Sequence, residues 1–517
     1  MKWYDGFALA MAVPALLLYS LGDMAARLGV GSIIVWIISM FCAVWIVFGY
    51  AELAGMFPNK AGGFGVFQYM AWRNADFAKK HPVVADTIGC IGVWGYWWAW
   101  SPVLAIGGLV VGNWFQLIFP QIPLYIGGFI PTDVIIGAAF LFILYMINYF
   151  GIVAGAFVSW ILTFCTIIPL GILSIGPFFM GLVDWSNFVP FLPMDWRFYG
   201  GGVLLDSWWQ PMALYGILGG LFIASWCDWA YEAAAVYTAE YQNPQKDTYK
   251  AILMSTIFCG FFYILLPITT YGVLGYDGII AAPLLAIPEI GIMMFGQTGG
   301  YLMMFMMMAA ILLALNQATN GGGRSLYQMA EDGLLLKQFA AVNKHKVPSV
   351  AMLYDVLFNV VLMFLRSPIV ILAASTVGYN VVQILGNRAF FFLRKKFPNT
   401  PRPFKVPKWM LVFLWPMFIV CILQLSAAPV FGGNIGTLVG VVVAICVILV
   451  YTYRRKVQDR PGYKIFGESL LPDYLKGTPD KNGKLNALTD KIGFISLLLF
   501  IYALVLLFAY IGTLGFG

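Results

Sequence analysis

Leu214-Tyr-Gly-Ile-Leu-Gly-Gly-Leu-Phe-Ile-Ala-Ser225 is typical of a transmembrane helix, and it continues directly into Trp226-Cys-Asp-Trp-Ala-Tyr-Glu232. The first stretch is apolar and carries glycines at which a neighbouring helix can approach closely. The second places two carboxylates among three large aromatic side chains. A carboxylate inside an apolar span costs about 3 kcal/mol or more, so it is expected to face a cavity or a partner. The helix is predicted to end at Asn243-Pro244, because proline disfavours a helical residue before it.

The two carboxylates, Asp228 and Glu232, are four residues apart. If the helix is continuous there, they lie on one face of it. We interpret them as part of a binding site. The alternative is a pair of buried carboxylates with a purely structural role.

The overall composition is typical of helical membrane proteins. The 517 residues are 61% hydrophobic and only 10% charged, with 18 Trp and 42 Phe. A soluble protein of this length carries far more charge. Apolar runs of membrane-spanning length recur along the chain, which predicts an all-α polytopic membrane protein. The net charge of +7 resides in loops between these runs, so it does not indicate a nucleic-acid partner.

The chain carries no sequence signal of an enzyme. No nucleophile–base pair or metal-ligand cluster is recognisable, and the GxxxxGKS/T motif for nucleotide phosphates does not occur. The seven cysteines lie in apolar surroundings without CxxC spacing, so we interpret them as packing residues. We therefore expect no metal, no cofactor and no direct use of ATP.

Thirteen apolar segments are predicted to cross the membrane. The first resembles a signal peptide, but the positively charged region that precedes it is weak and a second span follows almost at once. We therefore interpret it as a retained helix. A polar stretch, 454–491, precedes the last span. The predicted spans are 7–24, 32–53, 86–115, 135–152, 155–182, 214–240, 251–274, 302–326, 350–365, 369–393, 410–425, 437–453 and 492–514.

Basic residues gather in alternate loops and so predict the orientation of the spans. They cluster after spans two, six, eight and ten, whereas the opposite side has little beyond Arg27, Arg197 and Arg366. The N-terminus is therefore predicted to be cytoplasmic, in a multi-pass protein of the cell membrane. The last span would place the C-terminus outside.

Spans one and six each carry an interruption near mid-membrane, Pro14 in the first and Cys227-Asp-Trp-Ala230 in the sixth. Pro14 alone would indicate no more than a kink. Because the two spans are five apart, an odd number, the two halves of the chain would be inverted relative to each other. Discontinuous helices at matching positions of inverted halves are typical of transporters that bind their solute at the midplane.

Three stretches on the predicted cytoplasmic side carry a family resemblance. They are 52–63 with Glu52-Leu-Ala-Gly-Met-Phe-Pro58, 320–336 with Asn320-Gly-Gly-Gly-Arg-Ser325, and 393–407 with Phe397-Pro-Asn-Thr-Pro-Arg-Pro403. Together with Glu240 and Asn243-Pro244, they resemble the amino acid–polyamine–organocation permease superfamily over about residues 5–455.

That superfamily shares a fold of two inverted repeats of five helices, with helices 1 and 6 broken. The resemblance implies repeats at 1–183 (helices 1–5) and 184–398 (helices 6–10), followed by helices 11 and 12 at 399–455. Residues 456–517, a cytoplasmic connector with a thirteenth helix, fall outside the family's usual twelve.

The resemblance also implies a cavity lined by spans one, three, six, eight and ten. Trp226 corresponds to an occluding aromatic of related arginine and polyamine carriers, and Glu232 to a carboxylate linked to gating and proton sensing. Many relatives have a glycine-rich break in span one whose amides hold the substrate's carboxylate. Here Ala12-Val-Pro-Ala-Leu-Leu-Leu18 has no glycine and Pro14 has no N–H, which argues against an ordinary α-amino acid as substrate.

Acidic and aromatic residues are expected to replace that glycine-rich site. Asp228 stands where relatives usually have a neutral residue, and aromatic rings of spans three and six can hold a cation. The alternative is that the tryptophans serve packing and that polar residues of spans eight and ten merely bridge helices. The candidate substrate-binding residues are Pro14, Ala15, Leu16, Trp97, Trp100, Ser101, Trp226, Cys227, Asp228, Tyr231, Asn316, Gln317, Thr319, Asn380 and Gln383, with Glu232 and Trp226 assigned to coupling and gating.

The sequence thus predicts a secondary active transporter of amino acids or related organic amines, driven by an ion gradient through alternating access. The alternatives are a polyamine or methylated-amine permease or exchanger, and a sensor that binds the amine without moving it. Its expected partners are a small amine-bearing solute and membrane lipid. The oligomeric state stays open.

The coupling ion is predicted to be the proton rather than sodium. No charged residue occurs between Asp133 and Asp184, so the span-five lysine of many proton-coupled relatives is absent, and Thr319 is only a candidate sodium ligand. Glu232 remains, as a carboxylate partly removed from water that can exchange protons.

Overall fold

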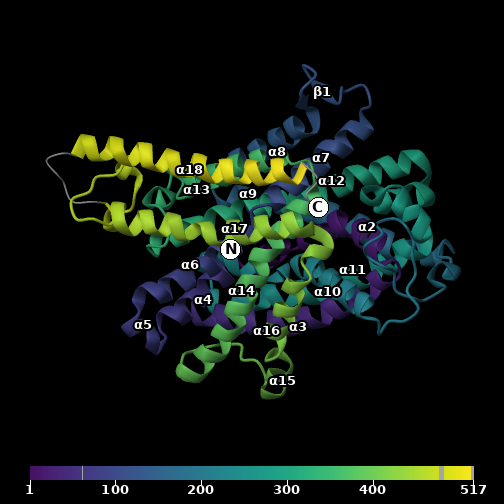
Figure 1. Cartoon of the computed structure of the whole chain (residues 1–517), viewed down its shortest axis with the longest axis horizontal. Coiled ribbons are helices and arrows are strands. Elements are labelled where there is room, and N and C mark those ends of the chain that lie inside the picture. Colours follow the sequence, from purple (N-terminus) through teal and green to yellow (C-terminus); the bar gives the residue numbers. More distant parts are fainter. Residues whose placement is uncertain (61, 477–482, 514–517) are drawn as a thin grey trace.

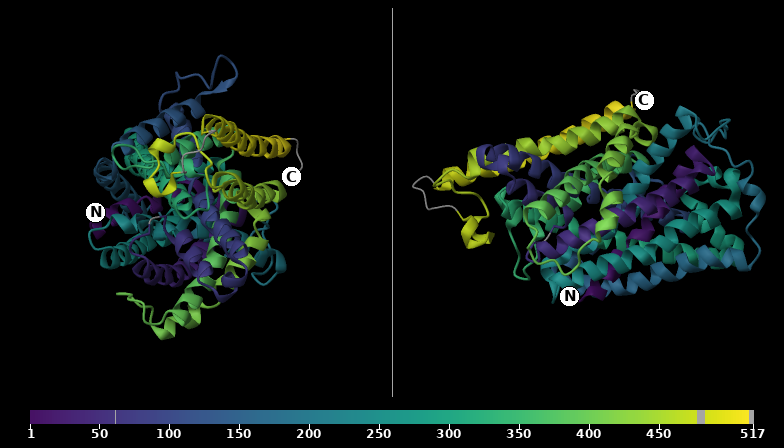
Figure 2. Two further views of the ribbon diagram at one scale, coloured as in Figure 1. Left: turned by 90° about the vertical axis from the view of Figure 1, so that its left-hand side faces the viewer. Right: turned by 90° about the horizontal axis from the view of Figure 1, so that it is seen from below.

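The computed structural model describes residues 1–60, 62–476 and 483–513, with their side chains except at 152–156, 483–485 and 505–513. The chain forms a bundle of helices that run mostly along the long axis of the molecule (Figure 1 and Figure 2). Strand structure in these described ranges is limited to the antiparallel pair β1 (Tyr125–Ile126) and β2 (Ile130–Pro131) and one isolated bridge. The predicted all-α class is confirmed.

The helices follow one another with short connections. The α-helices are α1 (Trp3–Ala10), α2 (Leu17–Leu28), α3 (Gly31–Met56), α4 (Phe64–Arg73), α5 (Asp76–Lys80), α6 (Pro82–Trp100), α7 (Val103–Ile118), α8 (Thr132–Tyr149), α9 (Ile152–Phe179), α10 (Pro211–Asp228), α11 (Pro244–Ala281), α12 (Ala286–Glu331), α13 (Ser349–Met363), α14 (Pro368–Lys396), α15 (Leu411–Leu414), α16 (Met417–Ser426), α17 (Pro429–Tyr453) and α18 (Gly483–Thr513). The 3₁₀ segments are η1 (Val13–Leu16), η2 (Trp185–Phe188), η3 (Ala230–Glu240), η4 (Pro283–Leu285), η5 (Lys337–Ala340), η6 (Lys408–Met410), η8 (Glu468–Leu470) and η9 (Asp473–Leu475), and η7 (Arg454–Gln458) is a π-helical turn.

Twelve helical segments of the described chain are long and apolar enough to cross a membrane, and the shorter apolar helix α13 occupies the ninth predicted span. The chain is therefore a multi-pass helical membrane protein. The thirteenth predicted span corresponds to α18. Its predicted end at Leu514 lies outside the described residues, as does Ala61 of the stretch 52–63.

Two predicted spans begin beyond a bend in the helix that contains them. The eighth, predicted as 302–326, lies in α12, which bends at Gly296, and the twelfth, predicted as 437–453, lies in α17, which bends at Gly433. Both glycines have positive φ (70° and 59°), a conformation that strains other residues. Because apolar side chains continue around each bend, hydropathy alone does not mark where the crossing part begins.

Spans one and six are both interrupted, as predicted. In span one, the 3₁₀ turn η1 around Pro14 separates α1 from α2, because proline has no N–H for the α-helical ladder. In span six, α10 ends at Asp228 and the 3₁₀ helix η3 follows. The tighter winding of a 3₁₀ helix turns its side chains out of register with those of α10.

Spans one, three, six and ten form the interior of the bundle, whereas the last spans lie at its edge. Of an apolar 18-residue segment of each helix, 89% is buried in span one but only 17% in α18. Helix α18 runs along the surface beside α17 (Figure 1 and Figure 2) and also covers α13, where the Tyr502 and Phe358 ring centroids lie 5.8 Å apart.

The predicted domain limits fall at different kinds of position. The limits at 183 and 398 fall in connections after α9 and α14, whereas the limit at 455 falls inside η7, which continues α17. The inverted symmetry of the two predicted repeats stays a prediction.

Glu52 fixes the stretch 393–407 against the end of α3. Its fully buried carboxylate accepts hydrogen bonds from Arg394 (2.9 Å), Arg402 (2.7 Å) and the backbone N–H of Val406 (2.8 Å). Charge-assisted hydrogen bonds of this kind offset the cost of burying a carboxylate. Two of the quoted sequence stretches, 52–63 and 393–407, thus meet in one ion-pair network.

Candidate functional site

The two helix interruptions meet inside the bundle. The Ser20 hydroxyl of α2 lies 3.3 Å from the Cys227 thiol near the end of α10, and it also donates to the Leu16 carbonyl (3.2 Å). Tyr263 of α11 donates to the Val13 carbonyl at 2.6 Å. Backbone oxygens at the break are therefore bonded by side chains of neighbouring helices, as buried carbonyls require.

A narrow space between side chains, here called the first cavity, lies beside this meeting point. The Trp226 indole N–H donates to the Ala99 carbonyl at 2.8 Å, which holds the ring of α10 against α6. The space between the lining side chains is too narrow for a free water molecule. Its lining residues are Leu16, Ala99, Trp100, Trp226 and Tyr379.

A second cavity, of about 10 Å³, lies toward the end of the bundle that carries the basic loops. Trp100 lines both cavities and therefore forms the wall between them. Residues of η3 and of the last turns of α12 form the opposite wall. The second cavity is lined by Tyr96, Trp100, Ala233, Val236, Tyr237, Gln317, Ala318, Gly321 and Ser325.

Charged contacts cover the second cavity at this end. Arg324 forms an ion pair with Glu240, and its guanidinium lies 5.4 Å from the ring centroid of Tyr237, which lines the cavity. Lys60 donates to Asp332 at 2.6 Å, just beyond α12. Burial raises the pKa of the Asp332 carboxyl, and the Lys60 ammonium opposes that rise. The two ion pairs join the loops after spans two, six and eight.

Glu232 contacts side chains that line the two cavities, although it lines neither itself. Tyr379 donates its hydroxyl to Glu232 Oε1 at 3.1 Å, and the Trp100 indole and the Tyr96 hydroxyl lie beside the same carboxylate. Glu232 is fully buried, and its other oxygen, Oε2, has no hydrogen-bond partner among the described residues. The structure thus brings the predicted coupling residue together with the predicted Trp100.

Asp228 faces a different helix from Glu232. Its Oδ1 accepts a hydrogen bond from Ser39 of α3 at 2.8 Å, and it lines neither of the two cavities. Tyr231 also turns toward α3, with its hydroxyl 2.9 Å from the Met40 sulfur. The shared face holds only for a continuous helix, and the change from α10 to η3 between the two carboxylates removes that condition.

Trp97 and Ser101 of span three converge on a carboxylate that the sequence analysis passed over, Asp355 of α13. Asp355 Oδ1 accepts hydrogen bonds from the Trp97 indole (2.9 Å) and from the Ser101 hydroxyl (2.5 Å). The Ser101 oxygen in turn accepts a hydrogen bond from the Asn359 amide (2.8 Å). Asp355 is fully buried. Its position inside a predicted span is the same signal that singled out Asp228, so the sequence could have indicated it.

The polar residues of spans eight and ten divide into two groups. Asn316 bridges helices through hydrogen bonds with Asn148 and Ser159, and Thr319 donates to the Leu315 carbonyl of its own helix. Gln317, Asn380 and Gln383 form the second group, and each carries a buried polar atom without a hydrogen-bond partner in the described part of the chain. These atoms are the amide oxygen and nitrogen of Gln317, the amide oxygen of Asn380 and the amide nitrogen of Gln383. Gln317 is the one that lines a cavity described above, the second. In span one, Leu16 lines the first cavity, whereas Pro14 and Ala15 are buried in the packing.

Sequence comparison relates this arrangement to known proteins. A family profile described as amino acid permease matches residues 2–450. The γ-aminobutyric acid permease of Bacillus subtilis is 24% identical over 472 residues, which are 88% of this chain and 92% of that protein. The arginine/ornithine antiporter ArcD2 of Lactococcus lactis is 24% identical over 62% of this chain and 63% of its own length. The polyamine transporter PUT1 of Oryza sativa is 25% identical over 69% of this chain and 60% of its own length.

Proposed function

The chain belongs to the amino acid permease family and is a transporter of amino acids or amines; from this premise we propose that it is a secondary active transporter working by alternating access. It uses an ion gradient to carry a small amine-bearing solute across the cell membrane. The basic loops after spans two, six, eight and ten support a cytoplasmic N-terminus.

The partition of the bundle interior by Trp100 carries this proposal. Two narrow cavities lie on either side of that ring, and both are bordered by helices that are broken at mid-membrane. Alternating access requires a stage at which the solute site is shut on both sides. The first cavity is too narrow for a solute, so Trp100 or Trp226 moves when solute binds, as gating side chains do.

Glu232 is the group best placed to neutralise an amine in these cavities. It contacts Tyr379 and Trp100, which line them, and one of its oxygens lacks a hydrogen-bond partner within the described structure. A buried carboxylate in that state is stabilised by a cation or by a proton. The rings of Trp100 and Trp226 line the first cavity and add a cation–π surface. Asp228 is the second candidate, on the side of α10 that faces α3.

Recognition through the amine agrees with the chemistry of the relatives' named solutes. γ-Aminobutyric acid, arginine, ornithine and polyamines share an ammonium group, whereas polyamines have no carboxylate. Span one of this chain offers no glycine-rich nest for a carboxylate, and the Val13 carbonyl at its break is already bonded to Tyr263. We therefore place the main recognition element on the ammonium group.

We propose the proton as the coupling ion, with Glu232 as its acceptor. Protonation of this carboxylate weakens its bond with Tyr379, which ties η3 to α14, and so shifts the balance between conformations of the broken helix. The groups from which a sodium site would be drawn are engaged elsewhere. The Thr319 hydroxyl donates to Leu315 and the Val13 oxygen accepts from Tyr263.

Solute counterflow tests transport directly and separates it from the alternative of an amine sensor. A thermal-shift screen of the purified protein against amines and amino acids first identifies a stabilising solute. Proteoliposomes loaded with this solute are then given a trace of the labelled compound outside, and transient accumulation inside is expected. A solute that stabilises the protein but shows no counterflow would support the sensor and overturn the transporter.

A further inference from the structure

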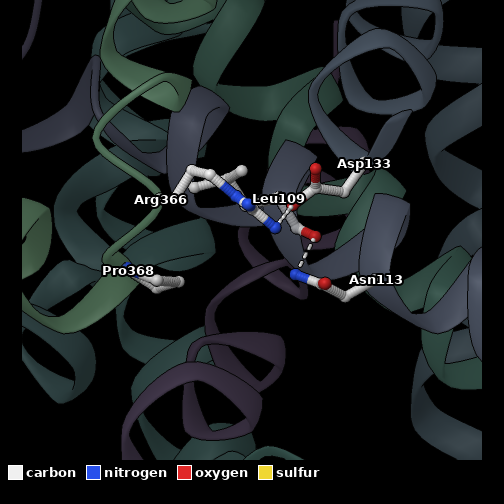
Figure 3. A pocket seen from close by; sticks show the side chains of 5 residues that line it. All are labelled: Leu109, Asn113, Asp133, Arg366 and Pro368. Carbon is white, nitrogen blue, oxygen red and sulfur yellow. Dashed lines mark hydrogen bonds and ion pairs between the residues drawn. The ribbon is translucent and has the colours of Figure 1, made fainter. Parts of the chain in front are cut away.

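A polar pocket lies at the end of the bundle opposite the basic loops, away from the two central cavities. It has a volume of about 360 Å³, within the roughly 300–1,000 Å³ typical of small-molecule sites. The last turns of α7, the start of α8 and the connection into α14 enclose it (Figure 3). It is lined by Leu109, Asn113, Asp133, Arg366 and Pro368.

The pocket holds one charge of each sign. Asp133 is only 2% exposed, and its carboxylate faces Arg366, while the Asn113 amide donates to the Leu109 carbonyl at 2.9 Å (Figure 3). Arg366 Nη2 lies 3.4 Å from Asp133 Oδ2, while its Nη1 donates to the Tyr125 hydroxyl at 2.7 Å. The second carboxylate oxygen, Asp133 Oδ1, is buried and has no hydrogen-bond partner in the described structure.

These contacts are poor for an ion pair whose role is only structural. Charge-assisted hydrogen bonds between guanidinium and carboxylate normally span about 2.7–2.9 Å and are often bidentate. Here one contact of 3.4 Å is made and Asp133 Oδ1 is left without a partner. Arg366 also adopts a left-handed backbone conformation (φ 52°), which costs a non-glycine residue about 1 kcal/mol or more and is found preferentially at functional sites.

We propose that this pocket is a second solute site, which binds the zwitterionic form of an amino acid. The ammonium group bonds to the free oxygen of Asp133, and the carboxylate bonds to the guanidinium of Arg366, whose side chain is 40% exposed and so accessible from water. Asn113 adds a neutral polar group to the lining (Figure 3). A polyamine has no carboxylate and is disfavoured by Arg366.

The site shares a ligand class with the proposed transport activity but none of its residues. It lies on the predicted extracellular side, near the start of α14, whose later residue Tyr379 lines the first cavity. An amino acid held there is concentrated next to the helix that borders the transport path.

Cysteine protection at Pro368 tests the proposal. In full-length Pro368→Cys protein in nanodiscs, the new thiol lines the pocket without altering either charge, and the parent protein measures background labelling of native cysteines. The rate of labelling by a membrane-impermeant maleimide is measured in the presence of alanine or γ-aminobutyrate. It is measured again with ethylamine or propionate, two compounds that carry a single charge. At about four times its Kd, an amino acid is expected to slow labelling roughly fivefold, whereas the singly charged compounds leave it unchanged.

Two charge variants in the Pro368→Cys background assign the protection to this pocket. Arg366→Gln should abolish it, and Glu232→Gln, near the central cavities, should leave it intact. The proposal is overturned if neither amino acid slows labelling, if ethylamine or propionate slows it equally, or if the protection survives Arg366→Gln. If Arg366→Gln does not fold, Asp133→Asn tests the ammonium side by the same criterion. Counterflow is measured separately, so either proposal can fail while the other stands.

Discussion

Tyr379 donates its hydroxyl to Glu232 at 3.1 Å and thereby joins α14 to the 3₁₀ half of span six. Tyr379 lines the first cavity, and Trp100, beside the same carboxylate, lines both. A change of charge on Glu232 therefore acts on the wall between the cavities and on the 3₁₀ half of span six together.

Glu232→Gln should uncouple transport from the proton gradient. The amide is isosteric but cannot exchange a proton, so uptake driven by an imposed pH gradient is expected to fall about tenfold or more in proteoliposomes. Counterflow needs no net driving force, so at solute concentrations above the weakened Kd of the variant it should fall much less. Tyr379→Phe keeps the carboxylate and is the matched control, with a smaller loss. Sodium-dependent uptake that ignores the pH gradient, or full concentrative uptake by Glu232→Gln, would contradict proton coupling.

Asp228→Asn distinguishes the two carboxylates of span six as amine anchors. Because Asp228 bonds to Ser39 of α3 rather than to a residue that lines a central cavity, solute affinity is expected to change less than about threefold, which is under 1 kcal/mol. Loss of the anchoring carboxylate, in contrast, costs about 2–5 kcal/mol. Binding isotherms of Asp228→Asn and Glu232→Gln against the same solute decide between them. A large loss confined to Asp228→Asn would make that residue the anchor.

Trp226→Leu should slow turnover more than it weakens binding. The indole closes the first cavity and bonds to the Ala99 carbonyl, so its loss removes a moving cover rather than a charge contact. The initial rate of counterflow and the equilibrium Kd are measured side by side. Trp226→Phe, which keeps a ring, is expected to retain more of the rate. Unchanged turnover in Trp226→Leu would exclude the covering role.

Glu52→Gln should destabilise the protein strongly. Removing one partner of a buried ion pair typically costs about 3–5 kcal/mol, and here Arg394 and Arg402 would both lose their carboxylate. The exposed pair of Asp76 and Lys396 provides the control, since Asp76→Asn should leave the melting temperature unchanged. Equal melting temperatures for the two variants would show that Glu52 does not hold the stretch 393–407.

Substitution by alanine at two neighbouring glycines of α12 should affect the melting temperature differently. A Cβ at Gly322 would lie 2.1 Å from Asp355 Oδ2, so Gly322→Ala must displace the carboxylate that Trp97 and Ser101 hold. At Gly321 the nearest atom would be 3.8 Å away, an ordinary contact. Gly322→Ala is therefore expected to lower the melting temperature, while Gly321→Ala keeps it. Similar melting temperatures would mean that α12 and α13 separate at little cost.

Much of the architecture follows from the sequence. Bilayer-length apolar runs locate the membrane-spanning helices, and Pro14 and the residues around Asp228 locate the two interruptions. These features depend on backbone chemistry and local composition, which a sequence contains directly. The bends at Gly296 and Gly433 were missed because apolar residues continue through them.

The orientation of single side chains could not be predicted in the same way. A change from α-helical to 3₁₀ winding within span six decides that Asp228 contacts α3 and Glu232 contacts α14. Likewise, whether Trp97 lines a cavity or bonds to Asp355 depends on how α6 is rotated against α13. Such rotations are set by packing between helices that are distant in sequence.

The covering of α13 by α18 has a consequence for the surrounding lipid. With 15 residues, α13 is about 22 Å long, shorter than the roughly 30 Å hydrocarbon core of a bilayer. A helix that short in contact with acyl chains would force the bilayer to thin, a hydrophobic mismatch with an energetic cost. Because α18 lies over it, with Tyr502 against Phe358, the thinning is relieved at this edge. The extra helix thus lets a short helix with a buried carboxylate, Asp355, reside in a membrane of ordinary thickness.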